Sequence, residues 1–250
     1  MMQHGVRAWI LKAARHVAVA AGYRIERPPA VEKTFAMAGL LARAAQRGMN
    51  FGTIIDVGAS DGKWSVRAAA HFPGAHFLLV EPLSEREQEL AALRKAQPQF
   101  DYALCAVGET SGETPFHVSD DLDGSGIGGA GAPAATRTVP LQSIDSLVRE
   151  RNLRGPFLLK LDTHGFEVPI LAGARETLRQ TSLLIVEVYN FKISDCCLRF
   201  HEMCSHLEAL GFRCCDLADP MRRPKDGMLW QMDFAFMAAD SPAWESASYR

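Results

Sequence analysis

Two acidic motifs in the first half of the chain have the residue types of a nucleoside-binding site. The first motif follows an apolar run and contains Asp56, Gly58, Ala59, Asp61 and Gly62. Its glycines let the backbone approach a ligand closely, but it lacks the three glycines of the dinucleotide fingerprint. A carboxylate at this point suits a positively charged ligand better than a pyrophosphate. A plain turn between a strand and a helix is the alternative interpretation.

The second motif ends the next apolar run with Glu81 and Pro82. A glutamate at a strand end is placed to accept hydrogen bonds from both hydroxyls of a ribose, and such charge-assisted bonds contribute about 1.5–3 kcal/mol each. The following apolar run contains Ala106, where a small side chain leaves room for a flat base. Together with the first motif these positions predict a nucleoside site, and a solvated glutamate is the alternative.

Ionisable side chains follow two apolar runs in the second half of the chain. Asp162, His164 and Glu167 come after one run, and Glu187 ends the other. If the runs are neighbouring strands, these groups meet at one rim and form a candidate acid/base cluster. His164 is the predicted general base, because an imidazole ordinarily titrates near pH 6.5. Asp162 and Glu187 are predicted to act as the base or to orient the substrate; a histidine that only orders its loop is the alternative.

The elements that must position these residues alternate between short apolar runs and helical patterns. The runs predict strands over residues 53–57, 76–80, 102–107, 157–161, 183–188, 212–217 and 229–237. Helices are predicted over residues 63–71, 84–96, 168–179 and 199–210. This alternation is typical of an α/β fold with a parallel sheet, whose ligands bind beyond the carboxyl ends of the strands. The connection before the last run is too short for a crossover helix, so that strand is expected to be antiparallel.

Two segments stand outside this pattern. Residues 1–50 contain 8 Lys and Arg against 2 acids, whereas the whole chain has a net charge of −2. We expect them to form a basic helical extension, with helices from residue 6 and over residues 31–47, before a domain at residues 51–250. Three roles are open for this extension: a cap or dimer element, a weak membrane-surface contact, or a solvated helix. The long Gly-rich stretch 108–140 predicts a functional or disordered loop with short strands at 114–118 and 137–139.

The composition excludes several classes of protein. With 250 residues, 48% of them hydrophobic, the chain has enough core to fold without disulfides, and its charge argues against a nucleic-acid partner. The six cysteines have neither CxxC nor Cys/His zinc spacing, and His201 and His206 are five residues apart, so no metal site is predicted. Free thiols and the absence of a signal or spanning segment predict a cytoplasmic protein.

Five motifs in order resemble the FkbM-type S-adenosylmethionine-dependent methyltransferases. They are IIDVGASDGKWS, LLVEP, VPLQSIDSL, LLKLDTHGFEVPILAGA and LLIVEVYNF, and they extend from about residue 53 to 237. The resemblance implies a Rossmann-like class I methyltransferase fold, a seven-stranded, mostly parallel sheet with an antiparallel last strand. It implies S-adenosyl-L-methionine as cofactor, with Asp56, Gly58 and Gly62 around its methionine part and Glu81 on its ribose.

The resemblance further implies methylation of a hydroxyl on a small molecule, sugar or glycan. The chain departs from the family at one place: the family commonly has KIDVEG where this chain has KLDTHG, so His164 replaces a usual glutamate. A role of that glutamate therefore does not carry over. The competing hypothesis is a catalytically silent module that binds the nucleoside and acts through a partner.

Overall fold

The computed structural model describes residues 34–127 and 135–248. By its internal contacts the chain divides into two compact units, Met1–Thr34 and Phe35–Arg250, and the description below concerns the second. The basic helix predicted from residue 6 lies outside the described residues. None of the helices in the described part is long and apolar enough to cross a membrane.

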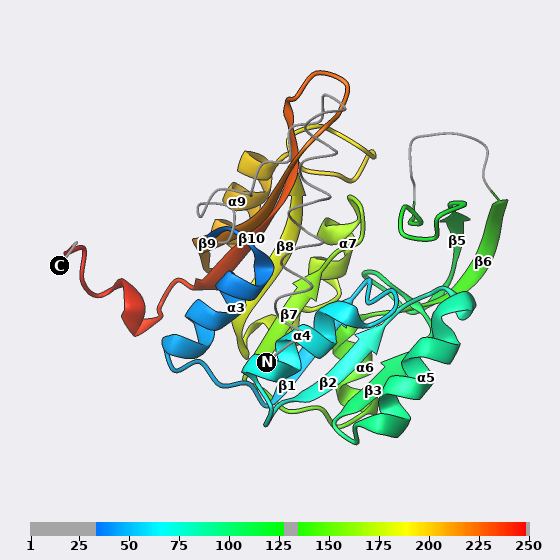
Figure 1. Cartoon of the computed structure of the whole chain (residues 1–250), viewed down its shortest axis with the longest axis horizontal. Helices are drawn as coiled ribbons and strands as arrows, with labels where there is room; N and C mark the ends of the chain where they lie inside the picture. Colours follow the sequence, from blue (N-terminus) through cyan, green and yellow to red (C-terminus); the bar gives the residue numbers. More distant parts are fainter. Residues whose placement is uncertain (1–33, 128–134, 249–250) are drawn as a thin grey trace, which may run out of the picture. The chain divides into compact units, whose positions relative to one another are not determined.

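A seven-stranded sheet forms the centre of this unit, in the order β3-β2-β1-β7-β8-β10-β9 (Figure 1). The strands are β1 (Thr53–Val57), β2 (His76–Val80), β3 (Phe100–Ala103), β7 (Phe157–Leu161), β8 (Thr181–Tyr189), β9 (Phe212–Arg222) and β10 (Leu229–Ala238). Neighbouring strands are parallel except for β10, which is antiparallel to both β8 and β9. The predicted fold class, including the antiparallel last strand, is confirmed.

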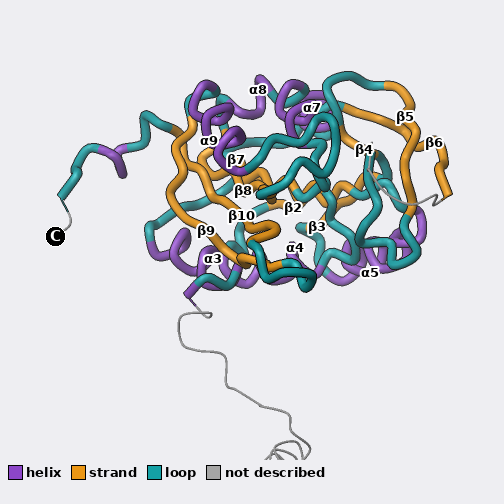
Figure 2. Tube along the Cα trace, turned by 90° about the horizontal axis from the view of Figure 1, so that it is seen from above, coloured by secondary structure: helices purple, strands orange, loops and turns teal. Residues whose placement is uncertain are grey.

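Helices cover both faces of the sheet, as the view from above shows (Figure 2). One face carries α3 (Met37–Gln46), α4 (Lys63–His71) and α5 (Glu87–Ala96), and the other carries α6 (Ile144–Glu150), α7 (Glu167–Ala172), α8 (Arg175–Leu178) and α9 (Phe200–Ala209). Each face has its own apolar core, centred on residues such as Ile54 and Leu158 on the first and Leu159 and Val186 on the second. Strands buried on both faces explain the continuous apolar runs of the sequence.

Three predicted elements are divided in the structure. A 3₁₀ turn (Ser84–Arg86) precedes α5, and the segment predicted as one helix at 168–179 breaks at Gly173 into α7 and α8. A Cβ at Gly173 would lie 2.2 Å from the carbonyl oxygen of Gly108, so only glycine allows this close backbone approach. The run 102–107 leaves the main sheet after β3 and continues as β4 (Ala106–Val107) in a second sheet.

The second sheet occupies the Gly-rich stretch that the sequence predicts as a loop. It has the order β4-β6-β5, where β5 is Gly112–Val118 and β6 is Ala135–Gln142. Both short strands predicted there are confirmed and are longer than expected. A small core of Leu83, Ala106, Phe116 and Val139 attaches this sheet to the carboxyl ends of β2 and β3. The sheet therefore stands beside the edge where ligands of such folds bind.

Helix α3 packs on the main sheet. Its Arg43 guanidinium donates to both carboxylate oxygens of Asp216 on β9, at 2.8 and 3.0 Å, and the Met37 amide donates to Asp219 at 3.1 Å. The buried residues are Met37, Leu40, Leu41 and Ala44. The spacing of apolar residues in the sequence predicts Phe35, Ala38, Leu41 and Ala45 on one face. Leu41 is buried and Ala45 is partly buried against the core, but Phe35 and Ala38 are exposed, and the helix begins at Met37 rather than at residue 31.

Candidate functional site

A cavity of about 350 Å³ opens at the carboxyl ends of β1, β2, β7 and β8. Of the predicted cofactor-binding residues, Gly58, Glu81, Pro82 and Ala106 line it, and so do the predicted catalytic residues Asp162, His164 and Glu187. Cavities of this size bind small molecules, and they commonly lie at strand ends of this kind. The nucleoside-type residues and the ionisable cluster thus share one space.

Glu81 is positioned by the backbone on both sides of it. Its Oε2 accepts a hydrogen bond from the Ser60 amide at 2.8 Å, and its Oε1 accepts one from the Leu83 amide at 2.9 Å. Burial raises the pKa of this carboxyl above its ordinary value, and the two amides oppose the shift. Each carboxylate oxygen has a second lone pair, so Glu81 can still accept bonds from a ligand in the cavity.

The loop after β1 lines the cavity with Gly58 and Ser60. Gly58 has φ +76°, and a Cβ there would lie 1.9 Å from the carbonyl oxygen of Asp162. The loop after β1 is therefore in direct backbone contact with the end of β7. This contact fixes the distance between the two halves of the site.

Four other predicted cofactor-binding residues lie outside the cavity lining. They are Asp56, Ala59, Asp61 and Gly62. Asp61 pairs with the exposed Lys63, and Ala59 is part of the apolar core. A Cβ on Gly62 would meet Leu93 at 2.4 Å, so this glycine lets α5 pack closely against the loop. These residues therefore support the loop without lining the cavity.

Asp56 belongs to a buried polar network beneath the cavity. It is fully buried, accepts from the Ser65 hydroxyl at 2.7 Å and pairs with the ammonium of Lys160 at 3.1 Å. Burial raises its pKa, and Lys160 opposes that shift. The same ammonium lies 3.1 Å from Asp162 Oδ2. Lys160, which the sequence analysis did not single out, therefore links the first loop to the ionisable cluster.

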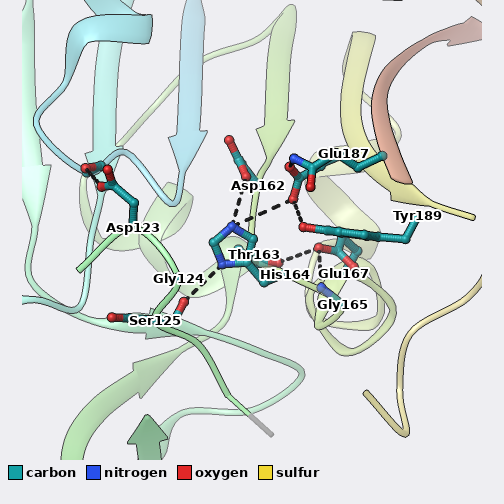
Figure 3. Close-up of polar contacts among 12 residues, drawn as sticks. Asp123, Gly124, Ser125, Asp162, Thr163, His164, Gly165, Glu167, Glu187 and Tyr189 are labelled. Carbon is teal, nitrogen blue, oxygen red and sulfur yellow. Dashed lines mark hydrogen bonds and ion pairs between the residues drawn. The ribbon is translucent and has the colours of Figure 1, made fainter. Parts of the chain in front are cut away.

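Asp162, His164 and Glu187 meet at the end of β7 and β8 (Figure 3). His164 Nε2 lies 3.8 Å from Asp162 Oδ1 and 3.9 Å from Glu187 Oε2. Its Nδ1 lies 3.2 Å from the carbonyl oxygen of Ser125, and its φ of 55° is unusual for a residue other than glycine. Tyr189 and Gln231 donate hydrogen bonds to Glu187. The predicted convergence of these three groups is observed.

The two carboxyls of this cluster have opposite pKa shifts. Burial alone would raise the pKa of Asp162, but the neighbouring Lys160 ammonium outweighs it and holds that pKa below the ordinary value. Burial and the charge of Asp162 raise the pKa of Glu187 well above the ordinary value. The two carboxyls therefore differ in the charge that lies beside each, the Lys160 ammonium for Asp162 and the Asp162 carboxylate for Glu187.

Glu167 does not join the cluster in the cavity. It is buried, accepts from the Thr163 hydroxyl and the Gly165 amide at 3.0 Å each, and does not line the cavity. Its place at the start of α7 makes it a support for the loop that carries His164. The prediction that Glu167 lies on the rim is wrong, because spacing alone does not give the direction of a side chain after a strand.

Several cavity residues escaped the sequence analysis because they come from the Gly-rich stretch. They are Phe116, Leu122, Asp123, Ser125, Gly126 and Ile127. Asp123 ties this stretch to the main sheet, since it accepts from the Ser60 hydroxyl at 2.9 Å and the Arg86 guanidinium at 2.7 Å. The only sequence signal for their role was the presence of Phe116, Leu122 and Ile127. Large apolar residues are unusual in a solvated polar loop and indicate that part of the stretch is packed.

The methyltransferase FkbM domain family matches residues 56–214 of the chain. None of the curated protein sequences matches it. Among solved structures, the FkbM methyltransferase of Methylobacillus flagellatus superposes with a TM-score of 0.50 at 15% identity. The match covers 73% of this chain and 43% of that protein, so this chain spans less than half of its length. This likeness supports the fold alone.

Two further solved structures are similar at TM-scores of 0.47. The 1,6-didemethyltoxoflavin-N1-methyltransferase of Burkholderia thailandensis, which holds S-adenosylhomocysteine, is 14% identical, and the match covers 94% of this chain and 90% of that one. The magnesium protoporphyrin IX methyltransferase of Synechocystis PCC 6803, solved with S-adenosylmethionine, is 10% identical over 91% and 90% of the two chains.

Proposed function

Because the chain belongs to the FkbM family of methyltransferases, we propose that it methylates a hydroxyl oxygen of a small molecule, sugar or glycan, with S-adenosyl-L-methionine as methyl donor. One observation carries this proposal. The cavity brings Glu81, a residue suited to a ribose, into the same space as Asp162, His164 and Glu187. A methyl donor and a hydroxyl acceptor need such adjacent sites, because the reacting atoms must lie in line.

The residues of the cavity fit the cofactor that the family uses. Glu81 would accept bonds from the ribose hydroxyls, Pro82 and Ala106 would border the base, and the backbone at Gly58 would lie along the methionine part. No large side chain stands at Gly58 or Ala106 to fill this space. S-adenosyl-L-methionine supplies a methyl group on a positively charged sulfur. The carboxylate of Asp162, kept ionised by Lys160, places negative charge in the same cavity.

The protein's part in such a reaction is to position the acceptor and remove its proton. We place the acceptor hydroxyl at the cluster of Asp162, His164 and Glu187. There His164, the predicted general base, accepts the proton of the hydroxyl. Phe116, Leu122 and Ile127 give the cavity an apolar wall, and electrostatic interactions are stronger beside apolar groups than in water. Ser125 fixes the His164 ring through its carbonyl, so the cluster needs little rearrangement when a substrate enters.

The decisive experiment separates cofactor binding from methyl transfer in the full chain. Calorimetry with S-adenosylhomocysteine measures the first, and transfer of a labelled methyl group to fractionated sugars, glycans and small-molecule extracts measures the second. We expect His164→Ala to lower turnover at least about a hundredfold with unchanged affinity, since removing a proton-transfer group costs that much. His201→Ala on the exposed side of α9 is the matched control.

Each outcome has a defined meaning. Turnover that survives in His164→Ala would remove His164 from the reaction. Tight binding without labelled product in any fraction would favour the silent module that acts through a partner. Labelled product on nitrogen or carbon would overturn the choice of a hydroxyl acceptor but leave the methyltransferase assignment standing.

A further inference from the structure

The ionisable cluster has the spacing of a set of metal ligands. Asp162, His164 and Glu187 each offer one ligand atom, and the three atoms lie within 4.8 Å of one another. The distances of 3.8 and 3.9 Å from His164 Nε2 to the two carboxylates are longer than the about 3.2 Å of a hydrogen bond. Ligands held at about 2.1 Å by one octahedral ion lie roughly 3.0 Å apart when adjacent and 4.2 Å when opposite. The two distances from His164 Nε2, 3.8 and 3.9 Å, fall between these values.

The orientation of the His164 ring also fits a metal ligand. A carbonyl oxygen can only accept a hydrogen bond, so the 3.2 Å contact with Ser125 requires the proton on Nδ1. In the neutral ring Nε2 then carries a lone pair that faces two carboxylate groups. Lone pairs that face each other repel unless a positive group lies between them. Imidazoles that bind metals are commonly held by such a bond from their other nitrogen to a carbonyl.

A third carboxyl lies beside the cluster. Asp233 on β10 is in register with Glu187 on β8, so both side chains lie on the same face of the sheet. Asp233 is half-buried. It adds a third acidic group to the surroundings of His164.

Three carboxyls surround the proposed position of the ion. Asp162, Glu187 and Asp233 form a row across three neighbouring strands, and the ammonium of Lys160 lies 3.1 Å from Asp162 Oδ2. That ammonium is also paired with Asp56. Asp162 Oδ1 lies on the side of His164, 3.8 Å from Nε2. A positive ion between Oδ1 and Nε2 would favour the ionised form of these carboxyls.

We propose that Asp162, His164 and Glu187 bind a divalent metal ion, with Asp233 as a nearby charge that raises its affinity. One imidazole with two carboxylates suits a first-row ion such as Mn²⁺ better than Mg²⁺ or Ca²⁺, which prefer oxygen alone. Three protein ligands leave open positions for an acceptor oxygen, whose pKa the ion would lower. This last role rests on the proposed function, whereas the ion site itself does not.

Electron paramagnetic resonance on the full chain tests the site with Mn²⁺ as the probe. Titration of the metal-free protein should show one bound Mn²⁺ per chain, and pulsed spectra should show coupling to an imidazole nitrogen. His164→Ala and Glu187→Gln should weaken binding about 100-fold or more, and Asp233→Asn by a smaller factor. Asp226→Asn, which removes an exposed carboxylate of the β9–β10 turn, is the control and should leave binding unchanged.

The wild-type spectrum keeps the proposal falsifiable even if a variant fails to fold. Absence of bound Mn²⁺ at millimolar concentration, or bound Mn²⁺ without nitrogen coupling, would overturn it and leave His164 as a direct base. Binding of S-adenosylhomocysteine is measured on the same samples. Loss of that binding while Mn²⁺ still binds would contradict the proposed function and leave the metal site intact.

Discussion

The contact between Gly58 and the end of β7 gives the sharpest test of how the site is assembled. An alanine at Gly58 would place its Cβ 1.9 Å from the Asp162 carbonyl oxygen, where carbon and oxygen normally approach to about 3.3 Å. One of the two segments must therefore move by roughly 1.4 Å. Because Asp162 belongs to the ionisable cluster, this movement would separate the two halves of the cavity.

Gly48 provides a matched control, since it has the same φ of +76° but no atom within 4 Å of its added Cβ. The left-handed conformation alone costs an alanine about 1–2 kcal/mol, which is what we expect Gly48→Ala to lose in free energy of unfolding. Gly58→Ala adds overpacking of about 1–3 kcal/mol, for a total of about 2–5 kcal/mol. Urea unfolding of both variants measures the difference.

Ligand binding distinguishes the two variants further. Gly58→Ala should weaken S-adenosylhomocysteine binding at least about tenfold, because displacements near 1 Å at a site are that costly, whereas Gly48→Ala should bind normally. Equal losses of stability in the two variants, within about 0.5 kcal/mol, together with equal affinities would refute this account of the loop.

Two other predictions concern the buried charges. Glu81→Gln should weaken S-adenosylhomocysteine binding about tenfold, because a neutral amide loses the charge-assisted bonds. In the wild type the pKa of Glu81 is raised above the ordinary 4.5, so this carboxyl takes up a proton, and the protein loses affinity, at higher pH than with an ordinary carboxyl. Calorimetry from pH 8 to 5 should show the affinity for S-adenosylhomocysteine falling as the pH falls. Glu81→Gln should lack that dependence. Lys160→Met should lower the free energy of unfolding by about 3–5 kcal/mol, because it leaves Asp56 buried without its partner, and a double variant with Asp56→Asn should recover part of the loss. A double variant no more stable than Lys160→Met alone would contradict that pairing.

The sequence was most informative where a strand is buried on both faces. Strands β1, β2 and β7 begin and end at the residues predicted for them, because each is a short apolar run between polar or glycine-containing turns. The side chains at their carboxyl ends followed from topology, since parallel neighbours end at one edge. This reasoning correctly brought Asp162, His164 and Glu187 together.

The features that the sequence missed depend on contacts between distant segments. The break at Gly173 comes from the backbone of Gly108, 65 positions away, and no local pattern records it. The run 102–107 divides because β4 pairs with β6 in the second sheet rather than with a strand of the main sheet. The position of Asp56 in the sequence predicts a ligand-binding residue. In the structure its carboxylate pairs instead with the ammonium of Lys160, which lies on another strand, and both groups are buried.

The placement of β10 between β8 and β9 has a consequence for the order in which the protein is made. Strand β10 is the last of the described strands along the chain, yet it pairs with both of its neighbours, and β9 has no other partner in the described sheet. Until residues 229–238 emerge from the ribosome, one edge of β8 stays open and Asp233 and Gln231 are missing beside Glu187. The half of the cavity that contains Glu81 can therefore form earlier during synthesis, whereas the half with the ionisable cluster is completed only after β10 has emerged. A chain interrupted before β10 would retain the first half and expose the edge of β8 to aggregation.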